Sequence, residues 1–214
     1  MREYTVRRAD ERPPLTGAPE GPWAGADSLD IDCHPWDTGR DRQHTEARAL
    51  YDDDALTLQY VCEDSHIEAS ATELNGPVWE DSCVEFFAAP HDDRPHYANF
   101  EGNCCGTFLM GYGPKEDRTH VEPATAAAVE VATSVAGPTK EPAPDDSGWW
   151  LAVRLPYSVL SALAGADIDP GPGTEWRANC YRIGGGTEYA AWNPVDAPEP
   201  DFHRPDSFGR FVFA

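Results

Sequence analysis

The stretch Leu56-Thr-Leu-Gln-Tyr-Val-Cys62 decides the fold class of this chain of 214 residues. Its Leu, Leu, Tyr and Cys fall at every second position, which is the period of a β-strand with one buried face. Residues 45–51 alternate in the same way, and the acidic turn Asp52-Asp53-Asp54 separates the two stretches. Two alternating stretches joined by a short turn predict an antiparallel β-hairpin.

Strand-like stretches recur at short intervals along the chain. Residues 124–136 are rich in Ala and Val, so helix and strand are both possible there, and the β-branched run at residues 129–135 favours a strand. One short helix is expected at residues 156–163, because Pro156 stands at its start and Gly165 follows its end. Further strands are expected at residues 83–89, 97–101, 106–112, 149–155, 175–183 and 208–213.

The number and spacing of these strands predict an all-β fold. We expect an antiparallel β-sandwich of the jelly-roll or immunoglobulin-like type with one short helix. The 20 Pro and 18 Gly residues argue against a helical bundle. The length suits a single core. Residues 1–28 are expected to form an N-terminal arm or loop, and residues 29–214 to form the sandwich.

The chain is strongly acidic. Asp and Glu total 38 against 16 Lys and Arg, which gives a net charge of −22. Such a surface repels phosphate backbones and anionic lipids, so we expect neither nucleic acid nor a membrane as a partner. Lys115 and Lys140 are the only lysines, a composition that fits either a high-salt cytosol or a GC-rich genome. In the first case the protein is halophilic and needs salt to stay stable and monodisperse.

The sequence shows neither a membrane span nor a secretion signal. No stretch approaches the roughly 20 apolar residues of a span, and charges occupy the N-terminus where a signal peptide is apolar. We therefore expect a cytoplasmic protein, unless a leader was removed. The six cysteines form no C-x-x-C pair, so zinc spacing is absent and reduced, buried thiols are expected.

A candidate ligand site begins at Trp79, which ends a loop just before the strand expected at residues 83–89. Along that strand Val84 and Phe86 alternate with Glu85, so Glu85 points away from a core that contains the other two. An aromatic ring can stack on the apolar face of a sugar, and a carboxylate accepts hydrogen bonds from two hydroxyls. The alternative is that Trp79 plugs one end of the sandwich.

Two further strands carry polar side chains on one face. These side chains alternate with small or apolar residues, and they can make paired contacts with vicinal hydroxyls. As a set flanked by loop aromatics they predict the polar floor of a sugar site, although ordinary solvent-facing positions would look the same. The residues are Asn99, Glu101 and Asn103 on one strand and Arg177, Asn179 and Tyr181 on the other.

Three segments, taken together and in order, resemble the family 9 carbohydrate-binding modules. The first is Leu50-Tyr-Asp-Asp-Asp-Ala-Leu-Thr-Leu-Gln-Tyr60, and the second is Trp79-Glu-x-x-x-Val-Glu-Phe-Phe87. The third is the closing segment Asp201-Phe-His-Arg-Pro-Asp-Ser-Phe-Gly-Arg-Phe-Val-Phe213. The resemblance spans residues 45–213. It implies a β-sandwich in which two aromatic rings clamp a terminal sugar and polar strand residues hold its hydroxyls.

The resemblance also implies roles for single residues. Trp79 matches one clamp residue, and Phe202 falls where the second, usually a Trp, would be. Glu85 matches a polar ligand, and Asn103 and Asn179 fit polar positions near the cleft.

One position departs from the family, and two further features bear on the site. Glu101 stands where the resemblance leads us to expect an Arg. His203 follows Phe202 and can reach a ligand, the alternative being an ordinary surface loop. Family members often carry structural calcium, for which the carboxylates of Asp52–Asp54 and Asp64 are candidate ligands, although the pattern favours ordinary solvated turn carboxylates.

The leading hypothesis is a non-catalytic module that binds a mono- or oligosaccharide in support of carbohydrate catabolism. A second hypothesis is a haem-binding electron-transfer sandwich, for which Met110 is the internal candidate for an axial ligand. A third is a glycoside hydrolase, because Glu85 and Glu101 can face one cleft.

Overall fold

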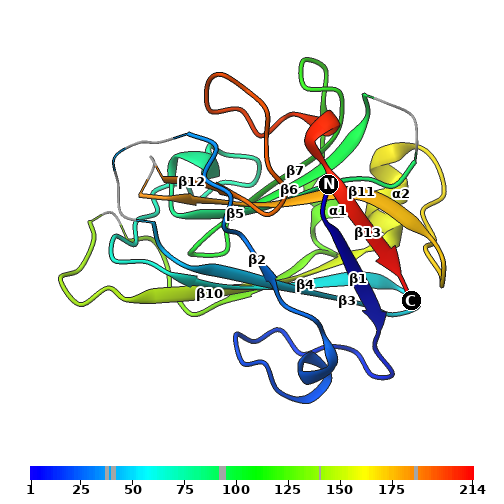
Figure 1. Cartoon of the computed structure of the whole chain (residues 1–214), viewed down its shortest axis with the longest axis horizontal. Coiled ribbons are helices and arrows are strands. Elements are labelled where there is room, and N and C mark those ends of the chain that lie inside the picture. Colours follow the sequence, from blue (N-terminus) through cyan, green and yellow to red (C-terminus); the bar gives the residue numbers. More distant parts are fainter. Residues whose placement is uncertain (37–38, 40–41, 92–94, 140, 186–187) are drawn as a thin grey trace.

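The alternating residues form the predicted hairpin, in which β3 (Thr45–Tyr51) pairs antiparallel with β4 (Ala55–Glu63). The computed structural model describes residues 1–36, 39, 42–91, 95–139, 141–185 and 188–214. Over these residues the chain is mostly β, and its strands lie in two packed layers (Figure 1). The prediction of a mostly β sandwich is therefore confirmed.

One layer is built around this hairpin. β4 pairs with β10 (Gly148–Pro156), and β10 pairs with β9 (Glu130–Thr133). The short β2 (Leu29–Asp30) pairs with β3. All these pairings are antiparallel, as the alternating pattern predicted.

The other layer contains the strands expected to carry the ligand site. β12 (Glu188–Ala191) pairs with the C-terminal half of β11. The remaining strands run in the order β8 (Thr119–His120), β7 (Phe108–Gly113), β6 (Tyr97–Asn103), β5 (Cys83–Ala89), β11 (Glu175–Gly184) and β13 (Gly209–Phe213).

Strand β1 (Glu3–Arg8) joins the two layers, because it runs parallel to β13 on one side and to β3 on the other. It lies inside the segment expected to be an arm, residues 1–28. Tyr4 and Val6 of this strand are buried in the main core. The alternation of these two residues is the only local sign of the strand, and it is too short to stand out.

The described residues contain two α-helices where one was predicted. α2 (Tyr157–Ala164) matches the expected helix and ends at Gly165, which adopts a left-handed φ of 65°. Within residues 124–136, for which helix and strand were both possible, α1 (Pro123–Ala126) forms the first part and β9 is the strand that the β-branched run favoured. Proline in its first turn and the following alanines favour a helical turn there. Three 3₁₀ turns are η1 (Gly21–Gly25), η2 (Val78–Glu80) and η3 (Pro205–Ser207).

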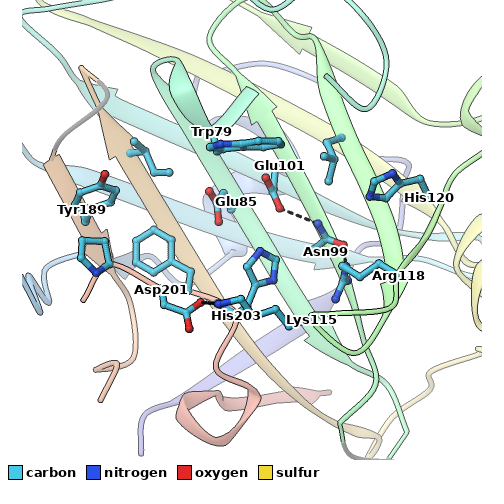
Figure 2. Close-up of a pocket in the computed structure, with 14 residues that line it drawn as sticks. Trp79, Glu85, Asn99, Glu101, Lys115, Arg118, His120, Tyr189, Asp201 and His203 are labelled. Atoms are coloured by element: carbon cyan, nitrogen blue, oxygen red, sulfur yellow. Dashed lines mark hydrogen bonds and ion pairs between the residues drawn. The ribbon is translucent and has the colours of Figure 1, made fainter. Parts of the chain in front are cut away.

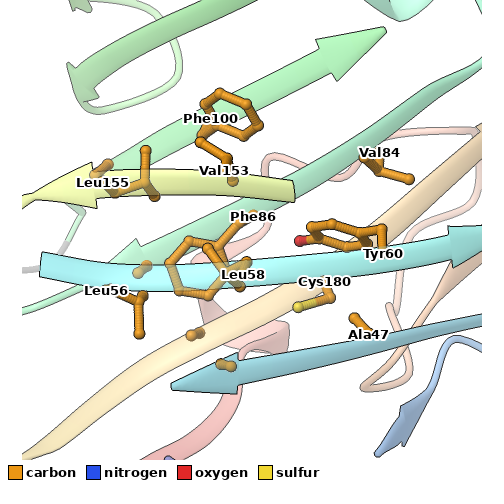
Figure 3. Close-up of a cluster of buried hydrophobic side chains, with 14 of the residues drawn as sticks. Ala47, Leu56, Leu58, Tyr60, Val84, Phe86, Phe100, Val153, Leu155 and Cys180 are labelled. Atoms are coloured by element: carbon orange, nitrogen blue, oxygen red, sulfur yellow. The ribbon is translucent and has the colours of Figure 1, made fainter. Parts of the chain in front are cut away.

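The main core fills the space between the layers. Leu58 and Tyr60 of β4 lie there with Phe86 of β5 and Phe100 of β6 (Figure 3). The Tyr60 hydroxyl donates a hydrogen bond of 3.0 Å to the backbone carbonyl of Glu85. The buried hydroxyl is thereby satisfied, and it links the two layers.

No helix of the described residues is long and apolar enough to cross a membrane. All six cysteines are free thiols, and four of them are buried. Burial raises the pKa of Cys62 to about 11, which keeps this thiol protonated and unreactive.

A buried ion pair ties the layers together. The Arg182 guanidinium of β11 lies 2.8 Å from the Asp64 carboxylate, and both side chains are 0% exposed. Trp149 Nε1 donates to the same carboxylate at 2.9 Å, and Arg182 donates to the Thr45 hydroxyl at 3.0 Å. A buried charge is costly without partners, so removing one member leaves the other unsatisfied.

Asp64→Ala is expected to lower the free energy of unfolding by about 3–5 kcal/mol, because the Arg182 charge stays buried without its partner. Unfolding in urea, followed by tryptophan fluorescence, measures this change. Asp32→Ala is the matched control, since the Arg2–Asp32 pair is exposed, and it should change the free energy by at most about 1 kcal/mol. Equal effects of the two substitutions would contradict the importance of the buried pair.

Candidate functional site

Strands β5 and β6 present acidic side chains on the face turned away from the main core. In the antiparallel register, Glu85 lies directly opposite Glu101 on β6 and opposite Tyr181 on β11. Phe86 and Phe100, one position away, belong to the main core. Because strand side chains alternate between faces, the two glutamates are neighbours on the outer face, with Cβ atoms about 5 Å apart.

This outer face is largely covered, because loops pack against it. A second hydrophobic cluster lies there and includes Phe87, Tyr97, Tyr181, Phe202 and Phe208. Within this cover a pocket of about 420 Å³ remains (Figure 2). Its floor comes from strands β5 and β6, and its walls come from η2, the segment before β8, strand β12 and residues 200–203.

Trp79 is the exposed aromatic side chain of the pocket. Its side chain is 45% exposed, whereas its neighbour Val78 is fully buried and anchors η2. Figure 2 shows the indole beside the carboxylates of Glu85 and Glu101. This exposure does not fit the alternative in which Trp79 plugs the end of the sandwich.

The two glutamates are buried at the floor, with exposed fractions of 2% for Glu85 and 4% for Glu101. Burial raises the pKa of Glu85 well above its ordinary value, and the nearby charge of Glu101 adds to the shift. Burial also raises the pKa of Glu101 to about 7, against the hydrogen bond from Asn99 and the charge of Arg118. At neutral pH the pair therefore retains at least one proton and can both donate and accept hydrogen bonds.

Asn99 and Arg118 orient the Glu101 carboxylate. Asn99 Nδ2 donates to Glu101 Oε1 at 2.7 Å, and Arg118 Nε donates to Asn99 Oδ1 at 3.0 Å. Arg118 also donates to the backbone carbonyls of Tyr97 and Gly113, and its guanidinium lies 4.3 Å from the centre of the Tyr97 ring. These contacts hold the floor in one arrangement before a ligand binds.

His203 and Phe202 form part of the wall. His203 Nδ1 lies 2.7 Å from the Tyr97 hydroxyl, and burial lowers the pKa of His203 to about 4, so the ring is neutral at pH 7. Phe202 is 7% exposed and stacks on Tyr181, with ring centroids 4.2 Å apart and planes 19° apart. Most of its surface is thus covered within the protein, and the half-buried Tyr189 adds a further aromatic wall.

The pocket brings together six of the ten side chains that the sequence singled out. They are Trp79, Glu85, Asn99, Glu101, Phe202 and His203. They come from η2, two adjacent strands and the segment before η3, so residues more than 100 positions apart share one cavity.

The other four predicted residues lie outside the pocket lining. Asn103 holds the turn between β6 and β7 through its side-chain amide. Asn179 exchanges hydrogen bonds with the backbone of Asn193, and Arg177 donates to a backbone carbonyl of η3. Tyr181 is 0% exposed, and the ring of Phe202 stacks on it.

The sequence interpretation missed several residues of the pocket wall. Arg118 lies outside the strands expected to carry the site, yet it supplies a cation beside Glu101. The resemblance had led us to expect an Arg at position 101 of β6. The cation beside the site instead comes from Arg118, in the segment before β8. The other missed polar or aromatic residues are Lys115, His120, Tyr189 and Asp201.

Three of the four carboxylates considered as calcium ligands, those of Asp52, Asp53 and Asp64, form ion pairs with arginines. Asp52 lies 2.6 Å from the Arg154 guanidinium, and Asp64 forms the buried pair with Arg182. Over the described part of the chain, no group of three or more His, Cys, Asp or Glu residues could hold a metal ion.

Comparison with known proteins agrees with this architecture. The chain matches the model of carbohydrate-binding family 9 over residues 24–213, and it therefore belongs to that family. No curated protein matches the chain significantly.

Solved structures resemble the chain over almost its whole length. A candidate carbohydrate-binding protein from Bacteroides uniformis is 27% identical with a TM-score of 0.84, and the match covers 99% of each chain. A family 9 module from Caldicellulosiruptor kristjanssonii in complex with cellotriose is 13% identical with a TM-score of 0.65, covering 99% of this chain and 93% of that one. The structure of a family 9 module from the same organism with glucose is 13% identical with a TM-score of 0.63, covering 98% and 95%. The last two show the shared fold.

Glu101→Gln is expected to change how stability depends on pH. The pKa of Glu101 is raised on folding from 4.5 to about 7, so its contribution to stability is complete below about pH 4.5 and is lost as the pH rises to about 7. The free energy of unfolding falls by about 3 kcal/mol over this range. The glutamine variant does not show this fall, because glutamine does not titrate. Urea unfolding of both proteins between about pH 5 and pH 8 measures the difference.

The comparison of the two proteins cancels the titration of His203, whose lowered pKa acts in the opposite direction. Stability curves that run parallel over this range would contradict the raised pKa of Glu101.

Proposed function

We propose that this protein binds carbohydrate, holding a terminal sugar of a mono- or oligosaccharide beside Trp79 without cleaving it. The observation that carries the proposal is an exposed indole beside a buried, polar floor. Membership of carbohydrate-binding family 9 supports it, as do the relatives solved with cellotriose and with glucose. In this role the protein would serve carbohydrate catabolism by retaining sugars near the enzymes that use them.

The two parts of the site contribute differently to binding. Burial of one sugar face on the Trp79 ring would stabilise the complex by about 1–3 kcal/mol. Glu85, Glu101 and Asn99 would orient the sugar through its hydroxyls and select among sugars. Arg118 already holds Asn99 in place, so this side chain needs little ordering on binding.

The environment of the two glutamates favours binding over hydrolysis. A retaining glycosidase needs one protonated carboxyl and one ionised carboxylate, and the two environments must separate their pKa values. Here burial raises the pKa of both Glu85 and Glu101, so neither carboxyl is kept fully ionised at neutral pH. The haem hypothesis depended on Met110, and this residue is 0% exposed in the main core.

Trp79→Ala is expected to abolish measurable sugar binding, because the stacking surface is removed, while the melting temperature stays nearly unchanged. Isothermal titration calorimetry with glucose and cellotriose measures binding, and scanning calorimetry measures melting. Trp150→Ala is the control, since Trp150 is a partly exposed Trp of β10 that lies outside this pocket. Retention of binding by Trp79→Ala, or equal loss in both variants, would refute the proposal.

A further inference from the structure

We propose that the pocket selects amino sugars, with the free ammonium group of the sugar placed between the carboxylates of Glu85 and Glu101. This inference rests on the carbohydrate binding proposed above and names the class of sugar that the floor fits best.

The first reason is that the floor has hydrogen-bond acceptors without partners. Among the described residues, the Glu85 carboxylate receives no hydrogen bond and forms no ion pair, although Glu85 is only 2% exposed. Glu101 receives one hydrogen bond, from Asn99 to Oε1, which leaves Oε2 without a donor. Buried carboxylates normally have partners, so these oxygens are positioned to receive donors from a ligand.

The second reason is that the nearby donors are already engaged. Arg118 donates to Asn99 and to backbone carbonyls, and the amide of Asn99 donates to Glu101. Lys115 forms an ion pair of 2.9 Å with Asp201, and His203 is bound to the Tyr97 hydroxyl. Among the described residues, a sugar carboxylate would therefore find no unpaired Arg or Lys beside the floor, and it would face two acidic groups.

An ammonium group supplies both the hydrogen-bond donors and the positive charge that the floor lacks. It brings three donors and a positive charge to adjacent acidic side chains, in a site where little water screens the attraction. It also sits close to the Trp79 ring, and cations bind favourably against the face of an indole. The pairing of Glu85 opposite Glu101 on adjacent strands places both carboxylates within reach of one such group.

The wild-type protein provides the main test. Calorimetry at neutral pH compares glucosamine and galactosamine with glucose and galactose, and with the two N-acetylated sugars, which keep the nitrogen but lose its charge. We expect at least one amino sugar to bind about tenfold more tightly than both its neutral and its acetylated counterpart. Equal or weaker binding of both amino sugars overturns the inference and leaves the proposed function standing. Absence of binding by every sugar overturns both.

Variants locate the preference. In the double variant Glu85→Gln/Glu101→Gln, the ratio of amino-sugar to neutral-sugar affinity should fall to about one. If circular dichroism shows that the double variant is unfolded, the same ratio is measured in the two single variants. Glu80→Gln is the matched control, because it removes an exposed carboxylate next to Trp79 that does not line the pocket. The control should keep the full preference for amino sugars over neutral sugars. This result would show that the preference comes from the pocket and not from the general attraction of a cationic sugar to a chain with a net charge of −22. A preference that survives in the glutamine variants overturns the assignment to this pair.

Discussion

The structure depends on one constraint, which is that the central strands of one layer are buried on both faces. β5 and β6 contribute alternate residues to the main core and to the second hydrophobic cluster, and every residue of both strands is buried. A polar side chain on the outer face must then pair with a neighbour or line a cavity. Glu101 does both, and Glu85 faces the cavity beside it.

Keeping two acidic side chains side by side in a buried site is unfavourable for stability and useful for recognition. Desolvation raises the pKa values of both Glu85 and Glu101, and the charge of Glu101 raises that of Glu85 further. Functional sites commonly carry such perturbed groups. The remaining polar residues of the floor are fixed by Arg118, and ligand contacts therefore need little reorganisation.

The two aromatic residues expected to clamp a sugar have different environments. Trp79 is held by a short 3₁₀ turn and remains exposed, whereas Phe202 is covered by its contact with Tyr181. The side wall of the pocket also contains Tyr189, which strand β12 brings to the same cavity. The cation that the family resemblance led us to expect in place of Glu101 comes instead from Arg118, on the segment before β8.

The alternation of Leu56, Leu58 and Tyr60 was sufficient to predict the hairpin, and the same alternation in the other strands, with their number and spacing, predicted the fold class, because strand periodicity is a local property. The same local rule placed Glu85, Asn99 and Glu101 on one outer face. It could not distinguish a solvent-exposed face from a covered one, because the loops that cover this face come from distant segments. Tertiary packing alone therefore decided that Asn179 and Tyr181 are structural, that Arg118 enters the pocket, and that residues 3–8 complete the sheet.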